Sequence, residues 1–208
     1  MKARYATINR SASSEIVVLR SRFLGYVVRV EDDSSARTVI IEARKRHHDA
    51  RHHCSAFVLG PEGSIQRSND DGEPSGTAGA PMLDVMKGRG LCDVVAVVSR
   101  YFGGTLLGAG GLVRAYGDAV AAALDDAGVQ KRELQQIVEA TVPAADAGRI
   151  DNQLRAFTTI HNVAFPDDAV FTISVPMSDV DGFAERLAQL SAGTARLRET
   201  GTEWIDVP

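Results

Sequence analysis

The strongest constraint on the fold is an apolar segment that is followed by a glycine-rich segment and then by an amphipathic pattern. Residues 94–98 read Val-Val-Ala-Val-Val, without alternation, which is typical of a strand covered on both faces. Glycine occupies five of the nine positions 103–111. From Leu112 to Gly128 apolar residues recur every three or four positions, which predicts a helix. We therefore expect a sheet with its central strand here and a helix packed against it.

The remaining residues before position 130 predict further strands and two further helices. β-Branched and aromatic residues are enriched in two stretches of 16–30, which indicates two strands. Residues 32–35 (Asp-Asp-Ser-Ser) are suited to cap a following helix. Residues 53–59 and 64–67 flank a Gly-Pro-Glu-Gly turn and predict a hairpin. A short helix is expected from Pro81. These elements predict an N-terminal sheet with helices on one face.

The second part of the chain predicts a separate domain. A polar segment at 129–136 indicates a linker, because the hydrophobic pattern restarts after it. Residues 136–208 then follow the order strand, helix, strand, strand, helix, strand, which is typical of a ferredoxin-like domain. We therefore interpret the chain as an α+β protein with domains at 1–130 and 136–208.

Composition favours an ordinary globular protein, with 44% hydrophobic and 24% charged residues and a formal net charge of −4. No apolar run approaches the roughly 20 residues of a membrane helix, and the first residues lack the apolar core of a secretion signal. We expect a cytoplasmic protein without a membrane partner. Cys54 and Cys92 are the only cysteines, too few for a zinc site made of cysteines alone, and both are expected to be reduced. No metal or cofactor is expected.

Charge is distributed unevenly along the chain. Residues 1–135 hold 18 Lys and Arg against 16 Asp and Glu, whereas residues 136–208 hold 5 against 11. The segment 44–53 carries four fixed positive charges and four of the five histidines. One interpretation is a surface that binds nucleic acid or another acidic partner, with Arg44, Lys45, Arg46, Arg51, His52 and His53 as candidate residues. The alternatives are a helix end whose cations complement the helix dipole, a histidine metal site, or internal pairing of Arg51 and His53 with the carboxylates that follow.

Those carboxylates lie in a loop at 69–80. Oxygen-bearing side chains that suit a hard cation are concentrated there: Asp70, Asp71, Glu73, Ser75 and Thr77. The distal glutamate of a calcium loop is missing. A turn built by Asp and Gly is the simpler interpretation.

The glycine-rich segment is a candidate anion-binding loop, because it precedes a helix whose first backbone N–H groups lack partners. The residues proposed for it are Arg100, Gly103, Gly104, Gly108, Gly110, Gly111 and Arg114. The pattern is neither a Walker A motif nor a dinucleotide-binding fingerprint. Glycines that only permit a sharp turn and close packing are the competing explanation. No catalytic nucleophile is apparent, since Cys54 and the adjacent His53 would point to opposite faces of a strand.

Four stretches together resemble the IMPACT family, in the branch that contains the bacterial YigZ proteins. They are residues 21–26 (SRFLGY), 50–54 (ARHHC), 70–79 (DDGEPSGTAG) and 100–112 (RYFGGTLLGAGGL). The resemblance implies a first domain with the fold of the second domain of a small-subunit ribosomal protein, a fold shared with elongation factor G and with a family of small-molecule kinases. It also implies a ferredoxin-like second domain. Eukaryotic relatives regulate translation.

Two functions of different classes follow. The first is a non-catalytic protein that binds RNA, the ribosome or a translation factor through the basic segment and the glycine-rich edge, with a role in translation regulation. The second is an enzyme that handles a phosphate or a nucleotide with the glycine-rich loop. The weak catalytic signals favour binding.

Overall fold

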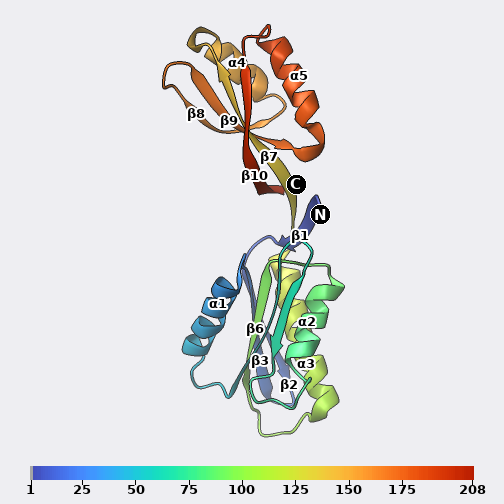
Figure 1. Ribbon diagram of the computed structural model, residues 1–208. Helices are drawn as coiled ribbons and strands as arrows, with labels where there is room; N and C mark the ends of the chain where they lie inside the picture. Colours follow the sequence, from blue (N-terminus) through green and yellow to red (C-terminus); the bar gives the residue numbers. More distant parts are fainter. Residues whose placement is uncertain (1) are drawn as a thin grey trace. The chain divides into compact units, whose positions relative to one another are not determined.

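The computed structural model describes residues 2–208 and divides into two compact units (Figure 1). The first unit ends at Lys131 and the second covers Arg132–Val207. Both units combine strands and helices, so the α+β class is confirmed. Within the described residues, no helix has the length and apolar composition needed to cross a membrane.

The first unit is built on an antiparallel sheet of five strands in the order β2-β3-β6-β4-β5. The expected central strand is confirmed, because β6 lies third in this order and its first five residues are at most 1% exposed. The hairpin expected around Gly60–Gly63 is formed by β4 and β5. The strand bounds are β2 Ala12–Val18, β3 Ser21–Arg29, β4 His52–Leu59, β5 Ile65–Asn69 and β6 Val94–Tyr101.

Helices cover both faces of this sheet, whereas the sequence predicted them on one face. Helix α1 (Asp33–Arg46) packs on one face against Phe57, Val95 and Val97. Helices α2 (Gly79–Gly88) and α3 (Gly108–Ala127) lie on the other side (Figure 1). The physical reason is strand alternation: the first five residues of β6 are apolar and buried, so successive side chains require cover on opposite faces.

The start of α1 agrees with its sequence. The Asp32 side chain accepts a hydrogen bond from the backbone N–H of Ser35, and Ser35 completes a capping box. The short strand β1 (Arg4–Ile8) is a feature that the sequence interpretation missed.

The segment 129–136, expected to be a linker, is instead the first part of strand β7 (Val129–Val142). A strand tolerates its polar residues because backbone hydrogen bonds do not depend on side-chain polarity. The side chains also find partners: Arg132 Nε lies 3.0 Å from Asp206 Oδ1, and Gln136 Nε2 donates to the Gly201 carbonyl at 2.7 Å.

The second unit has the strand order β10-β7-β9-β8, with one core cluster shared by the sheet and both helices. Ile150 and Leu154 from α4 and Phe183 and Leu187 from α5 are buried against it. This is the ferredoxin-like arrangement that the sequence predicted. The element bounds are η1 Ala144–Asp146, α4 Ala147–Leu154, β8 Thr159–Ala164, β9 Ala169–Pro176, η2 Met177–Asp179, α5 Val180–Leu190 and β10 Arg196–Val207.

Candidate functional site

The basic segment 44–53 runs from the last turn of α1 to the start of β4, and its candidate residues do not share one exposed face. Lys45, Arg46 and Arg51 are exposed. Arg44 is exposed but pairs with Asp71, with Nη2 2.7 Å from Oδ1. His53 is only 3% exposed. The six residues therefore divide into exposed cations and groups that hold the fold.

His53 is internal, as the alternative interpretation of the basic segment predicted. Its Nδ1 lies 3.0 Å from Ser99 Oγ, and its backbone N–H donates to Asp71 Oδ2 at 2.6 Å. Burial lowers the pKa of His53, and the nearby Arg44 charge lowers it further. His53 is therefore a neutral structural group. Arg51, in contrast, pairs with no carboxylate among residues 2–208.

Three guanidinium groups of the first unit lie over aromatic rings, two of them near the end of α1 and the third at the start of α3. Arg46 lies 5.3 Å from the centre of the Tyr26 ring, and Arg51 lies 5.8 Å from that of Phe102. The third pair is Arg22 on Tyr101, at 5.4 Å. These distances suit cation–π attraction, and Arg22 also pairs with Glu15. We call these three pairs together with Lys45 the basic edge.

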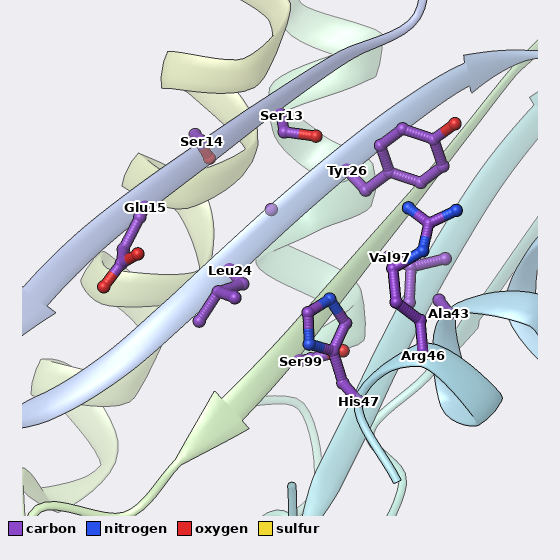
Figure 2. A pocket seen from close by; sticks show the side chains of 11 residues that line it. Ser13, Ser14, Glu15, Leu24, Tyr26, Ala43, Arg46, His47, Val97 and Ser99 are labelled. Carbon is purple, nitrogen blue, oxygen red and sulfur yellow. The ribbon is translucent and has the colours of Figure 1, made fainter.

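A groove beside the basic edge lies on the α1 face of the sheet (Figure 2). Its volume is about 430 Å³. Helix α1 packs over β4 and β6, so the same face of β2 and β3 is left uncovered. Leu24 and Val97 lie along the groove, Tyr26 and Arg46 bound one end, and strand β2 adds polar residues: Ser13, Ser14 and Glu15.

The ring of His47 lines this groove, and its contact with Tyr101 fixes its orientation. The Tyr101 hydroxyl donates to Asp49 Oδ1 at 2.9 Å and lies 3.2 Å from His47 Nδ1. Because the hydroxyl proton is used by Asp49, Nδ1 of His47 carries the proton that Tyr101 accepts. The other ring nitrogen is then directed away from this pair and is an acceptor in the neutral ring.

The acidic loop uses its carboxylates internally. Asp70 accepts hydrogen bonds from the backbone N–H groups of Gly76, Ala78 and Gly79, at 2.8, 3.0 and 2.8 Å. Burial opposes ionisation, but these three bonds outweigh it and hold the pKa of Asp70 below its usual value. Thr77 donates to the Pro74 carbonyl, and Ser75 is exposed. Within residues 2–208, no group of three or more metal-binding side chains gathers here or elsewhere.

The third acidic residue, Glu73, forms a buried ion pair with Arg100. Arg100 Nη1 lies 2.6 Å from Glu73 Oε1, and the Tyr116 hydroxyl donates to the same oxygen at 2.7 Å. Both charged side chains are less than a tenth exposed, 7% for Arg100 and 4% for Glu73. The Nε of Arg100 is buried without a hydrogen-bond partner in the described chain. The pair joins the acidic loop to the end of β6.

The glycine-rich segment serves two structural purposes. A Cβ at Gly103 would lie 2.0 Å from the backbone carbon of Arg20, so this glycine permits close packing on the β2–β3 turn. Gly104 and Gly108 have φ values of +84° and +70°, which favour glycine. Helix α3 begins at Gly108, before the start predicted from the apolar pattern, and no side chain caps it. Gly110 and Gly111 lie in its first turn.

A second cavity of about 430 Å³ lies at this helix start. It brings together members of all three candidate groups: Arg51 and His52 from the basic segment, Glu73 from the acidic loop, and Arg100 and Gly108 from the glycine segment. Arg114 is exposed on α3 and does not line it. The sequence interpretation did not place Phe102, Tyr26 or Tyr101 in a site, although aromatic residues beside arginines were visible in residues 22–26 and 100–102.

Neither cysteine is suited to nucleophilic chemistry. Cys54 and Cys92 are free and buried. Burial raises the pKa of Cys54 to about 12, so its thiol stays protonated at neutral pH.

The fold and these sites define an α+β protein of two parts, each with a counterpart among known families. The model of the Impact N-terminal domain matches residues 19–124, and that of a domain of unknown function, DUF1949, matches residues 141–194. The chain belongs to the IMPACT family, as the four sequence stretches indicated.

Relatives extend over nearly the whole chain. IMPACT family member YvyE of Bacillus subtilis is 40% identical over 97% of this chain and 94% of its own length. IMPACT family member YigZ of Escherichia coli is 36% identical over 86% of this chain and 90% of its own. A solved structure described as a crystal structure of a hypothetical protein has a TM-score of 0.66 at 31% identity, covering 97% of this chain and 99% of that one.

Proposed function

We propose that this protein binds single-stranded RNA through the basic edge and the groove beside it, and that it acts on the ribosome or on a translation factor complex as a regulator of translation. The single observation that carries the proposal is that three exposed arginines of the first unit lie over aromatic rings. Recognition of single-stranded RNA relies on the same components, namely aromatic and guanidinium planes on which unpaired bases stack.

The charges of the basic edge are available to phosphates. Within the described part of the chain, Lys45, Arg46 and Arg51 form no ion pair, and all three are exposed. An exposed cation gives up little hydration when it contacts a phosphodiester, and counterion release then favours binding. Arg22 contributes less, because Glu15 Oε1 lies 2.7 Å from its Nε.

The groove adds groups that contact bases rather than phosphates. Tyr26 offers a ring, while Ser13 and Glu15 on β2 offer hydroxyl and carboxylate oxygens. Oxygens of this kind accept hydrogen bonds from the amino groups on base edges. A duplex hides those edges, so the groove favours single strands.

The proposal is tested by fluorescence anisotropy with a short labelled single-stranded RNA of mixed sequence, titrated over a range of salt concentrations. In a variant with Lys45→Glu, Arg46→Glu and Arg51→Glu, we expect affinity to fall sharply and the slope of log K against log salt to flatten by roughly 2, about 0.7 for each lost phosphate contact. Arg44 is left intact because its pair with Asp71 supports the loop.

The matched control makes the same charge change on the second unit: Arg155→Glu, Arg196→Glu and Arg198→Glu, all exposed. Affinity of the control should stay close to that of the parent. Co-sedimentation of the parent with ribosomes in low salt, lost in high salt, would extend the proposal to the translation machinery. Equal affinities of the two triple variants would contradict binding through the basic edge.

A further inference from the structure

Exposed aliphatic side chains gather in two segments of the first unit, 17–19 and 106–113. Leu19, in the turn between β2 and β3, is 57% exposed, and Leu106, in the glycine-rich segment, is 84% exposed. Val17 near the end of β2 and Val113 near the start of α3 are exposed as well. We call these four residues the apolar tip. We propose that the apolar tip docks into an apolar groove with an acidic rim on a protein of the ribosome, where the ribosomal location rests on the proposed function.

The two segments of the apolar tip are held against each other. The backbone N–H of Gly103 donates to Ser21 Oγ at 3.0 Å, and Arg20 Nη2 lies 3.4 Å from Thr105 Oγ1. A Cβ at Gly103 would lie 2.0 Å from the backbone carbon of Arg20, so only glycine permits this approach. The two leucines of the tip directly adjoin Arg20 and Thr105. The contacts therefore bring both leucines to one surface.

The turn that carries Leu19 is strained. Val18 pairs with Ser21, so the turn consists of Leu19 and Arg20, whose φ values are +46° and +66°. A two-residue turn with positive φ at both positions favours Asn and Gly, because a larger side chain crowds the backbone there. Neither the stability of the fold nor solubility explains a bulky apolar residue that is both strained and exposed. Such a residue points to a role in binding.

Aliphatic side chains are suited to a protein surface rather than to RNA. Leucine and valine have neither a flat ring on which a base stacks nor polar groups that bind its edge. They contribute to binding by removing apolar area from water, and an apolar groove of a protein allows this. A bilayer also removes such area from water, but it is fluid and gains nothing from a fixed, strained turn. A protein groove has a fixed shape, so the rigid tip favours a protein.

The charges beside the apolar tip indicate an acidic rim on the partner. Residues 16–30 and 94–117 contain no Asp or Glu, and Glu15, just before the first range, is already bound in an ion pair. Arg20 and Arg114 are exposed, and neither forms an ion pair within residues 2–208. Carboxylates around the partner's groove would complement them. A second copy of this chain is disfavoured, because a two-fold contact through the tip would place these arginines against their own copies.

The first test removes apolar area at the tip without straining the fold. The variant carries Leu19→Asn, which suits positive φ, and Leu106→Asn at a highly exposed side chain, so it should melt no lower than the parent. Co-sedimentation with purified ribosomes in low salt should weaken at least about tenfold. Affinity for the labelled single-stranded RNA should stay within about threefold of the parent.

The matched control is Ile41→Asn with Ile65→Asn, two exposed aliphatic side chains of the first unit outside the tip. It should co-sediment with ribosomes as the parent does. A photo-crosslinker then shows what the tip contacts: Leu106→Cys is labelled with benzophenone maleimide, and Cys54 and Cys92 are protected by burial. Irradiation with purified ribosomes should give crosslinks to a ribosomal protein. Crosslinks to ribosomal RNA alone would overturn the proposal.

The outcomes separate this proposal from the proposed function. If the tip variant co-sediments as its control does while the parent binds RNA, the tip proposal fails and RNA binding stands. If only the tip variant is lost from ribosomes and no RNA binds the parent, RNA binding fails and the tip proposal stands. Absence of co-sedimentation by the parent overturns the tip proposal, and the anisotropy measurement then decides RNA binding alone. Binding to phosphatidylglycerol vesicles, or a dimer, that is lost in the tip variant would assign the tip to a lipid surface or to a second copy and overturn the proposal.

Discussion

The groove beside α1 and the cavity at the start of α3 lie on opposite faces of one sheet. Their charged side chains differ in exposure and in pairing. In the groove, Arg46 is exposed and rests on the Tyr26 ring. In the cavity, Arg100 and Glu73 are almost fully buried and are bound to each other. The basic segment 44–53 contributes residues to both. The comparison shows that one short segment supplies exposed cations to the groove and residues beside an internal ion pair.

The difference has an energetic consequence. Exposed cations contribute little to stability, so they are free to be used for binding. A buried ion pair has already lost its hydration, and removal of one partner leaves a charge with neither water nor counter-ion. We therefore expect substitutions in the groove to change affinity and substitutions around the cavity to change stability.

The largest effect is expected for Glu73→Leu, which leaves the Arg100 guanidinium buried without its carboxylate. The free energy of unfolding should fall by about 3–5 kcal/mol, measured by urea denaturation. Arg46→Leu in the groove should change it by no more than about 0.5 kcal/mol.

The double variant Glu73→Leu with Arg100→Met is the control for this comparison. It removes both charges and should recover much of the lost stability, because apolar replacement of a buried pair is often neutral. If Glu73→Leu and Arg46→Leu changed the free energy of unfolding by equally small amounts, the contrast between the two faces would be wrong.

A second comparison uses two glycines of the glycine-rich segment 103–111, one before α3 and one in its first turn. Gly103→Ala should destabilise the protein by about 2 kcal/mol or more, because a Cβ would lie 2.0 Å from the Arg20 backbone. Gly110→Ala should stabilise it by roughly 0.5–1 kcal/mol, since its Cβ meets nothing within 4 Å and alanine favours the helix. Thermal melts of the two variants check this. Equal losses would show that the whole loop is constrained by packing.

The smallest effect concerns His53, whose ring contacts Ser99 at the groove. Burial lowers the pKa of His53 in the folded protein, so below the unfolded value of about 6.5 the unfolded chain binds a proton that the folded chain does not. The free energy of unfolding should therefore decline as pH falls below about 6.5. In His53→Gln this decline should be shallower, as urea titrations at several pH values would show. An identical decline would mean that His53 is not the group responsible.

Much of the architecture could be predicted from the sequence because it depends on local patterns along the chain. The unbroken apolar run at 94–98 indicated the central strand, and Asp32 marked the start of α1. The polar residues after Val129 were misleading, since a strand satisfies its backbone whatever its side chains are. The prediction of helices on one face was wrong, although the same apolar run indicated that the central strand is covered on both faces.

The sequence by itself determined the family, most of the order of the elements and the three groups of candidate site residues. Only the tertiary structure decided which residues of those groups are paired or buried and which are exposed. His53 and Arg44 both bind Asp71 of the acidic loop, and Arg100 is bound by Glu73. Arg46 and Arg51 remain exposed and lie over aromatic rings. The physical reason is that burial and ion pairing depend on neighbours distant along the chain. The same residue type is therefore buried and paired at one position and exposed at another.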